Sequence, residues 1–351
     1  MVDSGRKLCV VMPMIGLAAC GGSGTLNTVG NDAGTDSVVD SPTGVDSQID
    51  GPIVPALAHH QYVISKALTP TTNAQALAYG LDLGSARSGT PDGTVDNRLG
   101  QVLAAFAGMG FDFQGAIDTA INQGSIILLV DFQTNDFLNT NSASLGVKFG
   151  TNPIPAACSG PTDTTCGHHL TGSASFSIAA DSPTDAPLDG TIVGGTFNGG
   201  PGALSLQITL GGTQPITLSL SNARAKATAI SDTGMTANLG GALSVADLNT
   251  QIFPALQVQI ADIITRDCGS TRTPPICGCA SGSTGQNLLN LLDGSDGTTR
   301  DCNVSLAEIE GNPLIKGLFS PDICSTTTCT TPDALSLGIQ VQTVKAMFPT
   351  M

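Results

Sequence analysis

The alternation of apolar and polar positions along the chain predicts a strand-rich middle with helices on both sides. Between residues 142 and 231, short apolar runs follow one another closely, separated by turn signals such as Asn-Gly-Gly-Pro-Gly at 198–202. Short strands at such intervals favour antiparallel pairing in a sandwich or a closed sheet. The expected strands in this part are 145–149, 170–179, 190–197, 204–210, 216–220 and 223–230.

Apolar spacing outside this middle part predicts helices and the strands next to them. The run 126–130 is short, continuous and apolar, which suits a buried strand. In 245–264, Leu and Ile recur at helical spacing and form one apolar face. Further helices are expected at 95–109, 113–123 and 306–319, and further strands at 62–68 and 335–348.

The order of these elements predicts the architecture. Strand, helices, strands, helices and strand follow one another without an internal repeat, which indicates one α+β domain over residues 56–351. Its strand-rich middle is 142–231, and its helical and Cys-rich part is 244–330. We therefore expect an antiparallel β-sandwich or closed sheet with flanking helices, held together by disulfides.

The first twenty residues have the zones of a secretory signal. Arg6 and Lys7 give a short charged start, and an apolar run over 8–19 follows it. This run is shorter than the roughly twenty residues that a helix needs to cross the hydrocarbon core. The sequence therefore predicts a cleaved signal peptide at 1–19 and export of the rest.

The end of this signal, Leu17-Ala18-Ala19-Cys20, resembles the bacterial lipobox. The resemblance implies lipidation of Cys20, with a diacylglyceryl group on its thiol, cleavage before it and acylation of the new amino group by a chain such as palmitate. Gly21, where inner-membrane lipoproteins usually have Asp, implies the outer membrane or the cell surface. Because each buried methylene contributes about 0.8 kcal/mol, several acyl chains would anchor the protein stably without further lipid contact.

Residues 20–55 are predicted to be a disordered acidic tether. They are rich in Gly, Ser, Thr and Asp and have few apolar residues to bury. A flexible coil of this length spans about 30 Å, so the folded part would stand away from the bilayer.

The charge balance limits the partners. The chain has 13 Lys and Arg against 28 Asp and Glu, for a net charge of −15 at pH 7. Nucleic acid is therefore excluded as a partner, because binding it depends on neutralising phosphates with Lys and Arg. Few aromatic residues, no Trp and abundant Gly are typical of secreted β-rich proteins.

The cysteines after the lipobox predict disulfides, because their number is even and the chain is exported. Cys158 with Cys166, and Cys324 with Cys329, are each expected to close a small loop. The pairing of the other four cannot be derived from their spacing, and zinc at Cys277-Gly-Cys279 is the weaker alternative in an oxidising compartment. The eight are Cys158, Cys166, Cys268, Cys277, Cys279, Cys302, Cys324 and Cys329.

Calcium is the cofactor that the acidic loops suggest. The stretch with Asp301, Asn303 and Glu308 resembles the exiting half of an EF-hand, in which a final Glu holds the ion with both oxygens. In that alignment Gly297 stands at the first position, where the pattern has Asp. The same residues also fit a capping box, in which Ser305 and Glu308 begin a helix without any metal.

The second candidate calcium loop contains Asp92 and Asp96. It resembles the Asp-rich loops of predicted myxobacterial-type surface lipoproteins of unknown function, and that resemblance implies that both carboxylates are ligands. A type I turn at 91–93 followed by an N-capped helix explains the same residues without a metal.

No catalytic motif stands out in the sequence. The histidines form two adjacent pairs, 59–60 and 168–169, without metalloprotease spacing, and there is no nucleophile elbow or phosphate loop. The leading hypothesis is a non-enzymatic, lipid-anchored surface protein with a structural or ligand-binding role, stabilised by calcium, whose ligand is unknown. The alternatives are a tethered hydrolase, which needs a His and a carboxylate converging on a Ser in a cleft, and a carrier of apolar molecules.

Overall fold

The computed structural model describes residues 56–84, 90–211, 214–297, 299–326 and 329–350. These residues belong to one compact unit, Pro55–Met351. The predicted signal peptide, Cys20 and the tether lie outside the described residues. Within the described ranges, no helix combines the length and the apolar character that crossing a bilayer requires.

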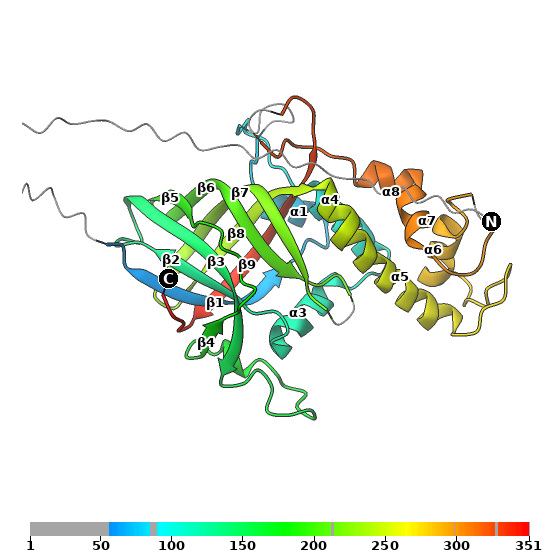
Figure 1. Cartoon of the computed structure of the whole chain (residues 1–351), viewed down its shortest axis with the longest axis horizontal. Coiled ribbons are helices and arrows are strands. Elements are labelled where there is room, and N and C mark those ends of the chain that lie inside the picture. Colours follow the sequence, from blue (N-terminus) through cyan, green and yellow to red (C-terminus); the bar gives the residue numbers. More distant parts are fainter. Residues whose placement is uncertain (1–55, 85–89, 212–213, 298, 327–328, 351) are drawn as a thin grey trace, which may run out of the picture. The chain divides into compact units, whose positions relative to one another are not determined.

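Eight antiparallel strands close into a barrel (Figure 1). Their order is β2-β1-β9-β8-β7-β6-β5-β3, and pairing of β2 with β3 completes the circle. β4, Ser175–Ile178, lies outside the circle and pairs with the last residues of β3. The barrel strands are β1 His59–Leu68, β2 Leu128–Gln133, β3 Thr140–Ile154, β5 Leu188–Val193, β6 Thr196–Ile208, β7 Ile216–Ser231, β8 Gly234–Ser244 and β9 Ala334–Lys345.

This closure confirms the closed-sheet alternative, and the sandwich alternative was wrong. The chain is mostly β with flanking helices rather than an even mixture. A sandwich of two sheets has unpaired edge strands, whereas closing the sheet leaves no unpaired edge around the circle. Each barrel strand has a partner on both sides: β3, for example, pairs with β5 at Thr140–Leu145 and with β2 at Ser144–Phe149.

The barrel interior is filled with apolar side chains. Phe132 of β2 and Phe197 of β6 are fully buried, and their rings meet edge to face with centroids 5.1 Å apart. Eight strands leave an interior just wide enough for side chains. The polar end of Tyr62 is satisfied by a 2.7 Å hydrogen bond to the carbonyl of Ser231. This packed interior does not favour the carrier of apolar molecules.

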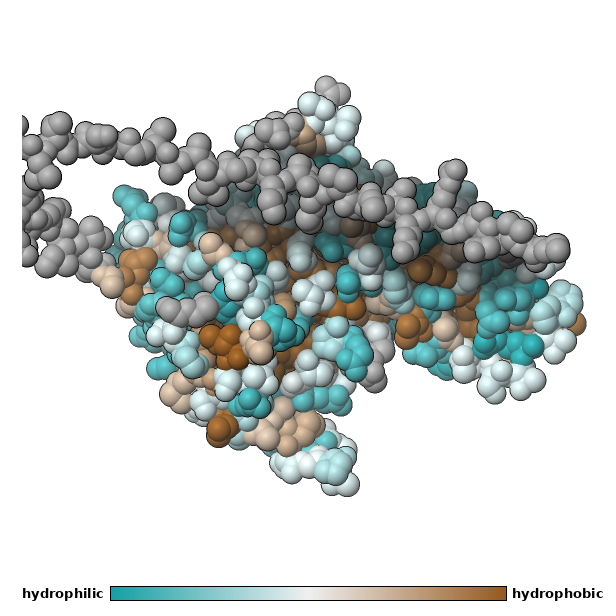
Figure 2. All heavy atoms as spheres, viewed as in Figure 1, coloured by the Kyte–Doolittle hydropathy of each residue, from teal (hydrophilic) through white to brown (hydrophobic). Residues whose placement is uncertain are grey.

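Two groups of helices flank the barrel, and buried residues of both belong to the same apolar cluster as its interior. The first group, between β1 and β2, is α1 Asn73–Tyr79, α2 Arg98–Gly108 and α3 Phe113–Gln123. The second, between β8 and β9, is α4 Val245–Asp247, the π-helical turn Leu248–Ile252, α5 Phe253–Cys268, α6 Thr284–Leu292, α7 Leu306–Gly311 and α8 Pro313–Leu318. On the face in Figure 2, hydrophobic residues form separate patches among hydrophilic ones.

One predicted turn was wrong. The glycine-rich segment 198–202 lies inside β6, and the chain turns instead at Gly194 and Gly195, where Val193 pairs with Thr196. Both turn glycines have positive φ, 57° and 75°. A two-residue hairpin turn of type I′ needs positive φ at both of its central residues. The register shifts twice within 199–204, so the glycines there bend a continuous strand rather than end it.

Three other elements also differ from the predictions in where they begin, end or divide. The expected strands 216–220 and 223–230 are one strand, β7, with a bulge where Asn222 takes a φ of 46°. The expected strand 170–179 is a short 3-10 turn, His168–Leu170, followed by the brief β4. The expected helix 306–319 is divided into α7 and α8 at Asn312, which precedes a proline. β8, α1 and α6 had not been predicted.

The eight cysteines form four disulfides. The predicted pairs Cys158–Cys166 and Cys324–Cys329 are confirmed. The two pairings that the sequence left open are Cys268–Cys279 and Cys277–Cys302. They join the end of α5 to the following loop, and that loop to the segment before α7. The disulfides therefore staple the second helical group.

Candidate functional site

The loop with the EF-hand resemblance is organised by a capping box. Glu308 is buried, and its Oε2 accepts hydrogen bonds from the backbone N–H of Ser305 at 2.7 Å and from its hydroxyl at 2.9 Å. The other oxygen, Oε1, accepts from the N–H of Gly294. Ser305 in turn accepts from the N–H of Glu308, so both halves of the box are present. The helix-cap alternative is confirmed.

Asp293 orders the same loop, and sequence analysis missed it. Its buried carboxylate accepts from the N–H of Asp301 through Oδ1 and from the N–H of Cys302 through Oδ2, both at 3.0 Å. Asp301 itself accepts from the N–H of Asn303 at 2.8 Å, and the side-chain oxygen of Asn303 accepts from Arg272. Backbone N–H groups thus hold these carboxylates in place.

The loop with Asp92 and Asp96 has a similar pattern. Asp82, also missed from the sequence, accepts from the N–H of Asp92 at 3.1 Å and from that of Gly93 at 2.7 Å. Asp96 accepts from the N–H of Leu83 at 2.8 Å.

Helix α2 begins directly after Asp96, as the N-capped alternative predicts. Asn97 is its N-cap and accepts from the N–H of Gly100. The pKa of Asp96 is raised to about 6, mainly by burial and also by the charges of Asp322, Asp92 and Asp82, against the lowering effect of its hydrogen bond from Leu83. Negative charge is therefore concentrated here, but each carboxylate already accepts hydrogen bonds.

Thermal unfolding in calcium chloride and in chelator tests the calcium hypothesis that the sequence suggested. Among the described residues, no group of three or more His, Cys, Asp or Glu is arranged to hold a metal ion. Because Glu308 and Asp293 already accept N–H bonds with both oxygens, we expect the same midpoint in both buffers. A midpoint that rises with calcium, by mass action on the folded state, would contradict this expectation.

His168 comes close to a serine and a carboxylate, but not in the arrangement of a catalytic triad. Its Nε2 lies 3.2 Å from the hydroxyl of Ser159 and 3.0 Å from Oδ2 of Asp163. A triad needs the serine and the carboxylate on opposite ring nitrogens. Hydrogen bonds, first from the N–H of Ser159 and then from Thr165, hold the pKa of Asp163 below its usual range. These contacts order a disulfide loop and do not favour the hydrolase.

The other histidines also have structural surroundings. His169 is fully buried edge-on to Phe176, and burial lowers its pKa. At the start of β1, His59 contacts Asp131 at 2.9 Å and His60 contacts Asp232 at 3.2 Å. Adjacent residues of a strand face opposite sides, which is why the pair has different partners.

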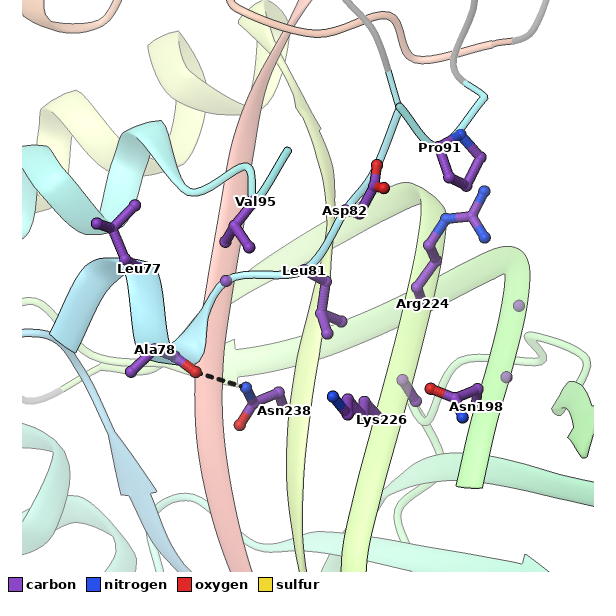
Figure 3. Close-up of a pocket in the computed structure, with 14 residues that line it drawn as sticks. Leu77, Ala78, Leu81, Asp82, Pro91, Val95, Asn198, Arg224, Lys226 and Asn238 are labelled. Carbon is purple, nitrogen blue, oxygen red and sulfur yellow. Dashed lines mark hydrogen bonds between the residues drawn. The ribbon is translucent and has the colours of Figure 1, made fainter. Parts of the chain in front are cut away.

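A depression of about 490 Å³ on the outer wall of the barrel offers a more specific chemistry (Figure 3). We call it the Arg224 depression. Strands β6, β7 and β8 contribute one wall, and α1 with the segments around 80–82 and 91–95 contributes the other. Its lining is Leu77, Ala78, Gly80, Leu81, Asp82, Pro91, Val95, Asn198, Gly199, Gly200, Arg224, Ala225, Lys226 and Asn238.

Arg224 is the unusual side chain of this depression. Its Nε is buried and has no hydrogen-bond partner within the described residues. The other described arginines all donate to carbonyl, amide or carboxylate oxygens; they are Arg98, Arg266, Arg272 and Arg300. Arg224 is therefore the one arginine of the described residues for which no acceptor is seen.

The register of strands β6, β7 and β8 places Lys226 and two asparagines near Arg224 on the outer face of the barrel. Lys226 lies two residues further along β7 and so faces outward as Arg224 does, while Ala225 between them faces the core. Asn198 of β6 and Asn238 of β8 pair directly with Lys226 on its two sides. Asn238 also donates to the carbonyl of Ala78 at 2.8 Å, which ties α1 to the barrel.

The other side of the depression is apolar. In Figure 3, Leu77 and Val95 lie at one side, Leu81 in the middle, and Arg224 at the other side. Leu77 and Val95 are 47% and 41% exposed. A cationic end and an apolar end therefore share one open depression.

Sequence analysis missed this site. Its only local signal is the outward pair of cations on one strand, which is no motif. Comparisons with family models, with curated proteins and with solved structures each found no match to this chain.

Proposed function

We propose that this chain is an exported, lipid-anchored binding protein and that the Arg224 depression binds an anionic ligand. The lipobox and the signal zones support export and anchoring. The depression supports the binding role, because it combines two cations, two amides and an exposed apolar wall.

The free guanidinium of Arg224 is the observation that carries this proposal. Its Nε has no partner, and no carboxylate within the described residues forms an ion pair with its guanidinium, so the terminal nitrogens can donate charge-assisted hydrogen bonds to a ligand oxyanion. Asp82 is the one carboxylate of the lining, and both its oxygens already accept backbone N–H groups. The donors of Arg224 are thus left to the ligand.

The variant Arg224→Gln is expected to weaken the binding of an anion at least tenfold. A hydrogen bond to a charged group contributes about 1.5 to 3 kcal/mol, and a factor of ten corresponds to about 1.4 kcal/mol. The measurement is isothermal titration of the purified full chain with hexanoate and with hexyl phosphate. Lys66→Gln, an exposed cation of β1 outside the depression, is the matched control. Equal affinity of Arg224→Gln and wild type would reject the proposal.

A further inference from the structure

We infer that the ligand of the Arg224 depression is an amphiphilic anion, with one carboxylate or phosphate head and one aliphatic chain. This inference rests on the proposed function and names the ligand class for the same site. It follows from the two unlike ends of the depression and from the charge of the chain around it.

The head is assigned to the barrel side. Arg224 and Lys226 stand two positions apart on β7, about 7 Å along the strand, and both side chains are long enough to converge on one oxyanion. Asn198 and Asn238 flank Lys226 on the neighbouring strands. Asn238 already donates to the carbonyl of Ala78, so the amide of Asn198 is the one assigned to the head. This set of donors suits a single compact oxyanion.

The aliphatic chain is assigned to the side of α1. Leu77, Leu81 and Val95 form an apolar wall, and two of them are largely exposed to water. Each methylene of a ligand that leaves water against such a wall strengthens binding by about fourfold. An anion without a chain would leave this wall exposed, so it uses only half of the site.

The charge of the protein excludes larger anions. With a net charge of −15, the chain repels polyanions. Arg224 and Lys226 are two cations against one carboxylate, Asp82, among the residues that line the depression. At about 490 Å³ it has the size of a small-molecule site. A small molecule with one anionic head satisfies both limits.

Isothermal titration of the full chain with four probes tests the inference. The probes are acetate, hexanoate, hexyl phosphate and hexanol. We expect at least one of the two long-chain anions to bind at least ten times more tightly than acetate and hexanol. The ratio of the affinities for hexanoate and hexyl phosphate then shows whether the head is a carboxylate or a phosphate. Leu77→Asn should lower the affinity for the long-chain anion severalfold without changing the affinity for acetate. Leu314→Asn, an exposed leucine of α8 outside the depression, is the matched control.

The outcomes separate the inference from the proposed function. If acetate binds as tightly as hexanoate and Arg224→Gln still weakens both, the anion site stands and the amphiphilic class is overturned. If hexanol binds as tightly as hexanoate, or if none of the probes binds, both are overturned. Circular dichroism of each variant confirms that it is folded.

Discussion

Replacing Cys20 by Ser is expected to abolish acylation and to remove the protein from the outer-membrane fraction. The resemblance of Leu17-Ala18-Ala19-Cys20 to the lipobox implies that the thiol of Cys20 receives the diacylglyceryl group. Without that thiol, no acyl chain can be attached at this position. The loss should be complete rather than partial, because in such an anchor the acyl chains would supply nearly all of the membrane affinity.

Mass spectrometry of the mature amino terminus is the direct measurement. The wild-type protein should begin at Cys20 and carry the mass of the acyl chains. Cys9→Ser is the matched control, since Cys9 lies within the predicted signal and leaves with it. An unmodified mature terminus, or one at another residue, would contradict the anchoring prediction.

Replacing Cys277 and Cys302 together by Ser is expected to lower the free energy of unfolding by about 3 kcal/mol. Their disulfide closes a loop with a sequence separation of 25, and removing it restores that loop's freedom in the unfolded chain. Both residues belong to the buried apolar cluster, so two serine hydroxyls there add a desolvation cost. The second helical group should loosen first.

Urea unfolding of the full chain measures this change. The matched control is Cys158→Ser with Cys166→Ser, whose separation is 8 and whose cysteines are only partly buried. That pair should cost less, about 2 kcal/mol. An unfolding midpoint equal to the wild type for the variant of Cys277 and Cys302 would show that this disulfide does not stabilise the fold.

Elements with strong local signals were predicted well. Helix α3 spans 113–123 as expected, because Asp112 caps its first turn and Gly124 ends it with a φ of 72°. β8 had no such signal, since its sequence is largely small and polar residues. It is a strand because β7 and β9 pair with it along both sides. Such pairing is a property of the closed sheet and not of the segment.

The candidate site was beyond sequence analysis for the same reason. Asn198 and Asn238 lie on different strands from Lys226, and the register of these three strands brings them side by side. The predicted calcium residues were found in ordered loops, but the carboxylates that organise those loops, Asp82 and Asp293, act through backbone N–H groups that no residue pattern reveals.

The sequence by itself was enough to predict export, to show an even number of cysteines after the lipobox and an acidic charge, and to favour an antiparallel sheet. These depend on composition and on neighbours a few residues apart. The tertiary structure decided that the sheet closes into a barrel, how four of the cysteines pair, and that Arg224 meets an apolar wall from α1. These depend on contacts between distant segments, which form only when the whole chain buries its apolar surface together.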